Sequence, residues 1–163
     1  MLMKNKWLFP LFLFFLLLID GQVSYLLSDF LGENSRINSH LILLALLCHL
    51  QEDDSPYLYW LYFMLGLIFD LYYVNMFGMA SLIFPCLIFL IRKMGYDKEV
   101  KFFQGLMVFI IMNFVFEIMI YGLASLYQLT TYPFLLFITY NLAPTLLYNI
   151  FLYLIFQLWK SNV

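Results

Sequence analysis

The sequence predicts an all-α polytopic membrane protein with six transmembrane helices, and three observations support this fold class. First, 65% of its 163 residues are hydrophobic and 21% are aromatic, whereas 11% are charged. A soluble domain carries roughly 25% charged residues, so this composition excludes a water-soluble globule. Second, apolar stretches alternate with short polar connections along the chain. Third, the basic residues are concentrated in a subset of those connections. We therefore expect a single transmembrane domain over residues 1–163, with lipid as its solvent.

Six apolar segments supply the expected helices. A crossing needs about 20 helical residues at a rise of about 1.5 Å each. The first, third, fifth and sixth segments reach this length, whereas the second and fourth are shorter and would need tilting or burial against neighbours. The first segment begins like a signal peptide, but its apolar run continues past Asp20 without a cleavage-type site, so we expect it to be retained. The expected spans are residues 7–28, 37–50, 56–75, 77–92, 102–128 and 132–159.

The distribution of cations predicts the orientation. With six crossings, all Lys and Arg residues except Arg36 fall on one side of the membrane. The positive-inside rule then places both termini and the 92–101 loop in the cytoplasm. Removing one short segment would put the N-terminal lysines and this loop on opposite faces, which favours six crossings. The cytoplasmic cations would be Lys4, Lys6, Arg92, Lys93, Lys98, Lys101 and Lys160.

The outer connections predict which helices are neighbours. Residues 75–77 and 128–132 are very short links, so the helices that they join should be antiparallel and adjacent. The one roomy outer loop covers residues 28–36 and is polar, with a glycine turn.

Polar residues recur at intervals of four along four of the spans. This spacing places each set on one face of its helix, and we expect those faces to point into the bundle rather than at lipid. The sets are Asp20, Ser24 and Ser28; Tyr62, Gly66 and Asp70; Asn113, Glu117, Tyr121 and Ser125; and Asn141, Thr145, Asn149 and Tyr153.

Three of these residues are carboxylates at similar depth in the outer half of the bilayer. An unpaired carboxylate at the centre of a transmembrane helix costs about 2.5–3.5 kcal/mol on insertion scales. We predict a cluster of Asp20, Asp70 and Glu117, capped by Arg36 and His40 one turn apart at the outer end of the second helix, with at least one carboxyl protonated. The alternative is that each carboxyl bonds its polar neighbours and only locks helices together.

Glycine and proline mark further positions. Gly66 lies one turn before Asp70 and permits close helix approach, and Gly78 marks a break after it. Pro85 and Pro144 should kink the fourth and sixth spans. The carbonyls freed near Tyr140 and Asn141 would then need donors, which polar side chains nearby could supply.

Signals for chemistry are absent from the sequence. His40 and His49 are nine residues apart, so on one helix they would face opposite ways and could not chelate a metal together. Cys48 and Cys86 lie in apolar runs and are expected to be small buried hydrophobes. No hydrolase, metalloprotease or phosphate-loop pattern occurs. We expect no catalytic residue, metal, cofactor or nucleic-acid partner.

Three stretches resemble the MreD family of rod-shape-determining proteins. The pattern YFMLGLIFDLYYVNMFGMASL is similar to its signature of a glycine, an aspartate four residues on, and a short outer turn with glycine. FEIMIYGLASL resembles its fifth helix and LAPTLLYNIFLYLI its sixth, as in Gram-positive members. The motif positions would be Gly66, Asp70 and Gly78, with Glu117, Pro144 and Asn149 in support.

The resemblance implies a non-catalytic inner-membrane partner of MreC. Such proteins belong to the elongation machinery that directs peptidoglycan synthesis and cell shape, together with RodA and a class B penicillin-binding protein. Their fold is similar to that of the substrate-binding (S) subunits of energy-coupling-factor vitamin transporters.

Two other classes of function compete with this interpretation. An S subunit should carry a ligand pocket near the outer face, where the predicted cluster also lies. It should also have an alanine-rich face on its first helix, yet residues 7–28 contain no alanine. An intramembrane enzyme is the third possibility, and no motif supports it.

Overall fold

The computed structural model describes residues 8–31, 35–52, 55–95 and 102–161. Over these residues the chain is helical apart from its connections, without strands, which confirms the all-α class. Because α3 continues into the π-helical turn η2, and α6 continues through η3 into α7, the described residues form six continuous rods. The bounds are α1 Leu8–Leu31, α2 Leu41–Glu52, α3 Tyr57–Phe69, η2 Asp70–Val74, α4 Ala80–Lys93, α5 Phe102–Leu126, α6 Phe134–Phe137, η3 Ile138–Leu142 and α7 Ala143–Ser161.

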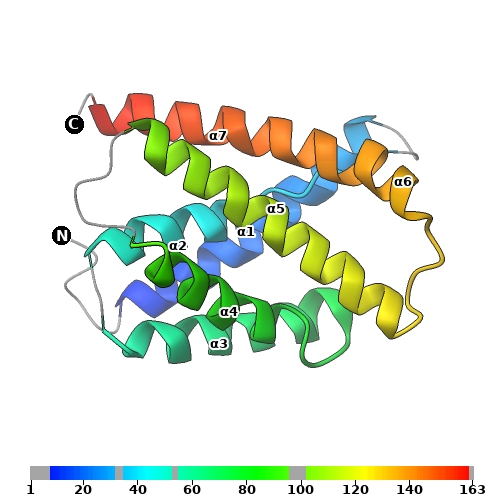
Figure 1. The fold of residues 1–163 in the computed structure, drawn as a ribbon, viewed down its shortest axis with the longest axis horizontal. Coiled ribbons are helices and arrows are strands. Elements are labelled where there is room, and N and C mark those ends of the chain that lie inside the picture. Colours follow the sequence, from blue (N-terminus) through cyan, green and yellow to red (C-terminus); the bar gives the residue numbers. More distant parts are fainter. Residues whose placement is uncertain (1–7, 32–34, 53–54, 96–101, 162–163) are drawn as a thin grey trace.

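The rods run back and forth along the long axis of the molecule. α1 begins, α4 ends, α5 begins and α7 ends near the left-hand end in Figure 1. α3 and α4 pack together more extensively than any other two elements, and α5 packs on α7. These are the pairs joined by short outer connections, so their predicted adjacency is confirmed.

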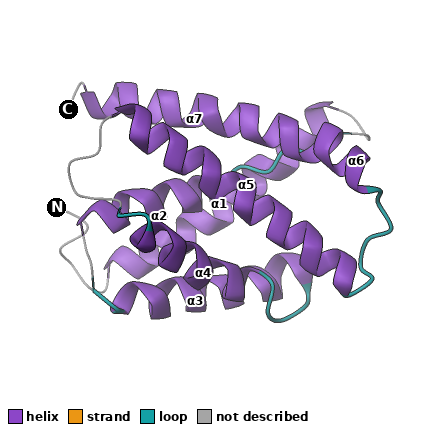
Figure 2. Cartoon of the chain, viewed as in Figure 1, coloured by secondary structure: helices purple, strands orange, loops and turns teal. Residues whose placement is uncertain are grey.

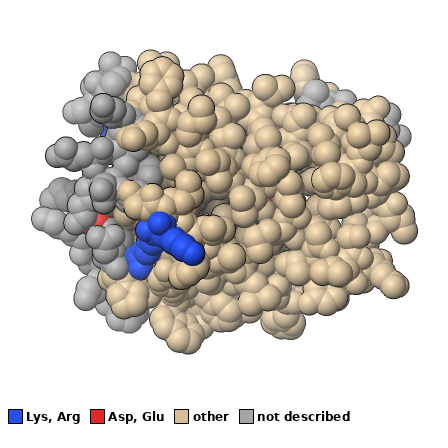
Figure 3. Space-filling model, viewed as in Figure 1, with Lys and Arg blue, Asp and Glu red and all other residues tan. Residues whose placement is uncertain are grey.

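The surface is that of a membrane protein. Leu8–Phe30, Phe102–Leu126 and Phe134–Lys160 are each long and apolar enough to cross a membrane, and α2 is a shorter apolar helix. On the face that Figure 3 shows, the visible Lys and Arg atoms gather near the end where Arg92 and Lys93 close α4, and most of the rest of that face is neither basic nor acidic. Lys4, Lys6, Lys98 and Lys101 lie outside the described residues.

The second segment differs from its prediction. The sequence predicts a helix over residues 37–50, but α2 begins at Leu41 and residues 35–40 are not helical. Arg36 and His40 therefore do not lie one turn apart on a helix. Figure 2 shows this loop running between helices rather than around them. Extended backbone advances about 3.3 Å per residue, so this stretch and α2 together reach roughly 38 Å, more than a hydrocarbon core of about 30 Å.

Pro144, the second residue of α7, explains the widened turn before it. Proline has no N–H, and its ring crowds the carbonyl four residues earlier, here that of Tyr140. The π-helical turn η3 accommodates the ring, and the Tyr140 carbonyl accepts a hydrogen bond from the Arg36 N–H at 3.0 Å. The predicted need for a donor is confirmed, but a backbone group meets it rather than a side chain.

The core is aromatic and aliphatic. The largest side chains with almost no exposure are Tyr62, Phe84, Phe109 and Phe116, which come from α3, α4 and α5. Cys48 and Cys86 are free thiols of intermediate burial, so they are less buried than predicted.

Candidate functional site

Asp70 is fully buried, and its carboxylate caps the start of α4. Its Oδ1 accepts a hydrogen bond from the Ala80 N–H at 2.7 Å. Its Oδ2 accepts bonds from the N–H groups of Gly78, Met79 and Ser81 at 3.1, 3.0 and 3.2 Å, and from the Ser81 hydroxyl at 2.8 Å. The first N–H groups of a helix lack partners within it, and the helix dipole favours an anion there. Every printed bond of Asp70 has its carboxyl oxygens as acceptors.

The two motif glycines build the same hairpin. A Cβ at Gly66 would lie 2.5 Å from Ser81 Cα and 2.6 Å from Ser81 N, so no side chain fits between α3 and the first turn of α4. Gly78 has a φ of +96°, which L-residues rarely adopt, and Asn75 turns the chain at a φ of +56°. Gly66, Asp70 and Gly78 thus position one element, the start of α4.

Asp20 caps the start of α2 in the way that Asp70 caps the start of α4. Its Oδ1 accepts a bond from the Leu41 N–H at 2.9 Å, and its Oδ2 accepts one from the Ile42 N–H at 3.3 Å. Each of these buried carboxylates therefore satisfies the start of a short helix from a neighbouring helix.

The extended residues before α2 donate alternately to two helices. On the α1 side, the Ile37 N–H donates to Ser28 Oγ at 3.2 Å and the Ser39 N–H donates to Ser24 Oγ at 2.8 Å. On the α7 side, the Asn38 N–H donates to Thr145 Oγ1 at 3.1 Å and the His40 N–H donates to Asn149 Oδ1 at 3.0 Å.

The spacing of the polar stripes matches this alternation. Four residues along a helix advance about 6 Å, and two residues of extended chain advance about 6.6 Å. A polar side chain at every fourth helical position therefore meets every second N–H of an extended strand. The predicted inward direction of the α1 and α7 stripes is confirmed over Asp20–Ser28 and Thr145–Tyr153. On α5, Asn113 and Glu117 are buried, but Ser125 is exposed.

Glu117 is paired in the interior with His40. Glu117 Oε1 lies 2.8 Å from His40 Nε2 and accepts a second bond from Asn38 Nδ2 at 2.8 Å. Glu117 and His40 are 3% and 5% exposed. The His40 ring also packs edge-on against Phe116, with centroids 5.1 Å apart.

A cavity of about 340 Å³ lies beside this pair. It brings together four of the five residues predicted to form a cluster, namely Asp20, Arg36, His40 and Glu117. The predicted membership of Asp70 is wrong, because its bonds all go to residues 78–81 and it does not line the cavity. The lining is Asp20, Gly21, Ser24, Arg36, Asn38, Ser39, His40, Ile42, Phe69, Tyr73, Phe116, Glu117 and Ile120.

The match to a known family covers nearly the whole chain. The family model described as rod shape-determining protein MreD matches residues 1–161. The chain belongs to the MreD family. The cell shape-determining protein MreD of Streptococcus pneumoniae is 33% identical over 144 residues, which cover 88% of this chain and 87% of that protein. No solved structure matches the chain, so the likeness to an S subunit remains a prediction.

Membership of the MreD family gives the chain a role in cell shape and agrees with a non-enzymatic membrane protein. Within the described residues, no three His, Cys, Asp or Glu side chains come together as a metal site. The described part of this MreD-family chain combines hydrogen-bonded helix caps with a polar cavity.

Sequence reasoning missed two polar partners in this MreD-family chain. Ser81 completes the Asp70 cap, and a signal existed, since it lies three residues after the Gly78 break where a helix must restart. Asn38 joins Glu117 to α7, because its carbonyl also accepts a bond from Asn149 Nδ2 at 2.8 Å. It was overlooked because residues 37–50 have the composition of a helix.

Proposed function

We propose that this protein is a non-catalytic membrane scaffold of the cell-elongation machinery, which binds MreC and helps to direct peptidoglycan synthesis. Membership of the MreD family carries this proposal. RodA and a class B penicillin-binding protein would be further members of the assembly. The chain would cross the bacterial inner membrane six times, with both termini in the cytoplasm.

The internal bonding supports a scaffold whose partner meets its outer faces. The carboxylates of Asp20 and Asp70 are used inside the bundle on the starts of α2 and α4. Large apolar side chains such as Phe12, Phe15 and Ile19 are exposed along α1. A single-span partner would pack on such lipid-facing surfaces, where close van der Waals contact drives helix association. Asp70 would then shape the bundle without touching the partner.

Affinity purification of the tagged full chain from native membranes tests this proposal. MreC should be recovered with the wild-type chain and with a Gly122→Ala control, because a Cβ at Gly122 would meet nothing within 4 Å. Recovery should fall with Asp70→Ala in proportion to the loss of folded protein. A monodisperse, folded wild-type chain that never recovers MreC would refute the proposal.

A further inference from the structure

The cavity between α1, residues 36–40, η2 and α5 is large enough to hold a small molecule. Its volume of about 340 Å³ lies at the lower end of the range of ligand pockets, about 300–1,000 Å³. Its lining is graded in exposure. Ser39, His40 and Glu117 are 4%, 5% and 3% exposed, whereas Arg36 and Tyr73 are the exposed members of the lining. The deep end is therefore built by the buried pair and the mouth by Arg36 and Tyr73.

The protein's own bonds leave specific polar groups of this cavity unused. Both hydrogen bonds of Glu117 use Oε1, and its Oε2 has no partner among the described residues. The Ser39 hydroxyl is buried beside the Asp20 carboxylate and makes no hydrogen bond of full geometry. At the mouth, no hydrogen bond or ion pair joins the Arg36 guanidinium to any residue that the structure describes.

The remaining polar groups of the cavity are already engaged. Asp20 accepts two backbone bonds at the start of α2, and His40 Nε2 faces Glu117. The deep end thus presents Glu117 Oε2 and the Ser39 hydroxyl, both able to accept hydrogen bonds. It contains two acidic side chains, Asp20 and Glu117, and one histidine, His40. The mouth presents a cation whose donors have no partner among the described residues.

We propose that this cavity binds a small zwitterion. A primary ammonium group would lie at the deep end, donating to Glu117 Oε2 and the Ser39 hydroxyl. An anionic group, such as a phosphate, would lie at the mouth against Arg36. Charge-assisted hydrogen bonds of this kind are about twice as strong as neutral ones, and a phosphate matches the donor fork of a guanidinium. This inference does not rest on the proposed function.

The same chemistry could come from a lipid headgroup or from a soluble molecule. Phosphoethanolamine carries both charges and occurs in both forms, so it is the probe of choice. The full chain would be purified in a maltoside detergent, which carries no charge, and titrated with soluble phosphoethanolamine. The midpoint of thermal unfolding and calorimetric binding would be measured, with ethanolamine alone and inorganic phosphate alone as half-ligands.

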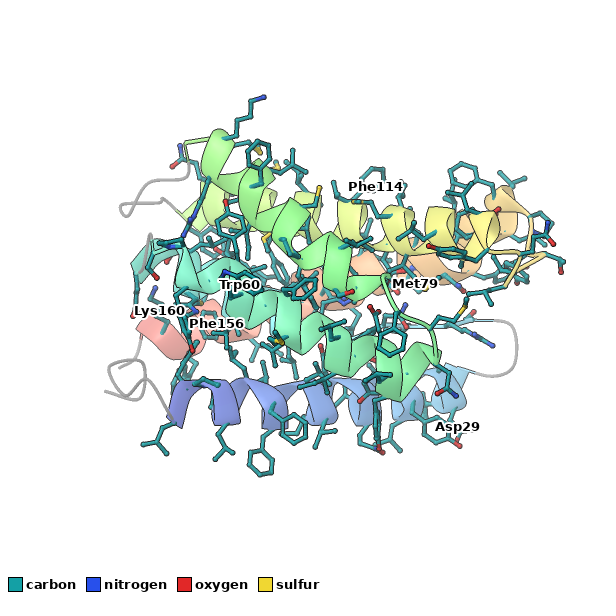
Figure 4. All side chains as sticks on the ribbon, turned by 90° about the horizontal axis from the view of Figure 1, so that it is seen from below. Asp29, Trp60, Met79, Phe114, Phe156 and Lys160 are labelled. Carbon is teal, nitrogen blue, oxygen red and sulfur yellow. The ribbon has the colours of Figure 1, made fainter. Side chains whose placement is uncertain are left out.

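The expected result is saturable binding of phosphoethanolamine that exceeds binding of either half-ligand. Arg36→Ala should weaken it about tenfold or more, because it removes a charge-assisted contact and no described bond of the protein. The backbone N–H that Arg36 donates to Tyr140 O is kept in this variant. Lys160→Ala removes a cation at the opposite end and should leave binding unchanged (Figure 4). Ser39→Ala should also weaken binding, because it removes an acceptor for the ammonium group.

A lipid source would be identified in nanodiscs. Phosphatidylethanolamine should raise the unfolding midpoint of the wild type more than phosphatidylglycerol, and Arg36→Ala should abolish the difference. Stabilisation by the soluble probe alone would identify a soluble zwitterion. No binding of either form, or binding that is equal in the wild type and Arg36→Ala, would overturn the proposal and leave a hydrated cavity. Loss of MreC recovery would not bear on this result.

Discussion

Gly66 and Ser81 meet backbone to backbone, so that a Cβ on Gly66 would lie 2.5 Å from Ser81 Cα. This contact holds the first turn of α4 against α3, one helical turn from Asp70. The close approach of Gly66 to Ser81 and the cap by Asp70 therefore position the same turn of α4. A substitution that disturbs one of them should weaken the other.

Gly66→Ala should destabilise the protein by at least the ~1–3 kcal/mol typical of overpacking, because the atoms that its Cβ meets are backbone and cannot rotate away. The midpoint of thermal unfolding in detergent measures this. Gly122→Ala is the matched control on α5, where no atom lies within 4 Å of the new Cβ. It should be neutral or stabilise by up to about 1 kcal/mol, as alanine does in place of a helical glycine. Equal midpoints for the two variants would contradict the contact.

The stability of the protein should decrease from the wild type to Asp70→Asn and further to Asp70→Ala. An asparagine can place its oxygen where Oδ2 accepts four bonds, but its amide then faces the Ala80 N–H. One unsatisfied buried donor costs about 1–3 kcal/mol, and the lost charge at a helix start adds to this. Alanine leaves all the donors unsatisfied and should cost more than about 3 kcal/mol. Thermal unfolding and the yield of monodisperse protein measure the order, and equal stability of all three would exclude the cap.

Ser24→Ala should destabilise the protein by about 1–3 kcal/mol, because the Ser39 N–H would lose its acceptor inside the bundle. Thr139 provides a matched control, since its hydroxyl bonds only carbonyls of its own helix, those of Leu135 and Leu136, and is exposed. Thr139→Ala should shift stability by no more than about 0.5 kcal/mol. If the two variants unfold at the same temperature, the alternating bonds of residues 36–41 contribute nothing.

The six-crossing arrangement predicts which cysteines react from which side. In a chain with Cys48 and Cys86 replaced by alanine, Asn75→Cys should react with a membrane-impermeant maleimide added to intact cells. Lys160→Cys should react only after the membrane is opened, since it lies at the opposite end of the molecule from Met79 (Figure 4). Labelling of both cysteines in intact cells would reject the predicted orientation.

Much of the fold was predictable because lipid imposes strict rules on sequence. Length and polarity located the rods, and a four-residue repeat of polar groups indicated the inward faces of α1, α3 and α7. Asp70 stood out because a carboxylate in an apolar helix is costly, and Gly66 because it permits close helix approach one turn before it. The family resemblance rested on the same residues and is confirmed over residues 1–161.

The partners of the polar groups were harder to predict. Sequence patterns compare side chains with side chains, whereas Asp20, Asp70, Thr145 and Asn149 accept bonds from backbone N–H groups. Backbone donors become available only where a helix starts or has not formed. Residues 37–40 directly precede the apolar run that begins at Leu41, so they were assigned to the same helix. Asp70 was assigned to distant Arg36 and His40 because charge pairing was sought before a local helix start was considered.

The extended stretch before α2 has a consequence for biogenesis. Its Asn38 and His40 amides find acceptors on Thr145 and Asn149, which follow 107 and 109 residues later in the chain. While the ribosome is still making the intervening part, these amides have no native acceptor and must remain hydrated or sheltered by the insertion machinery. Truncation before Thr145 should therefore yield an early half that is recognised by quality-control proteases. The last rod therefore supplies the acceptors that complete the hydrogen bonding of the residues between α1 and α2.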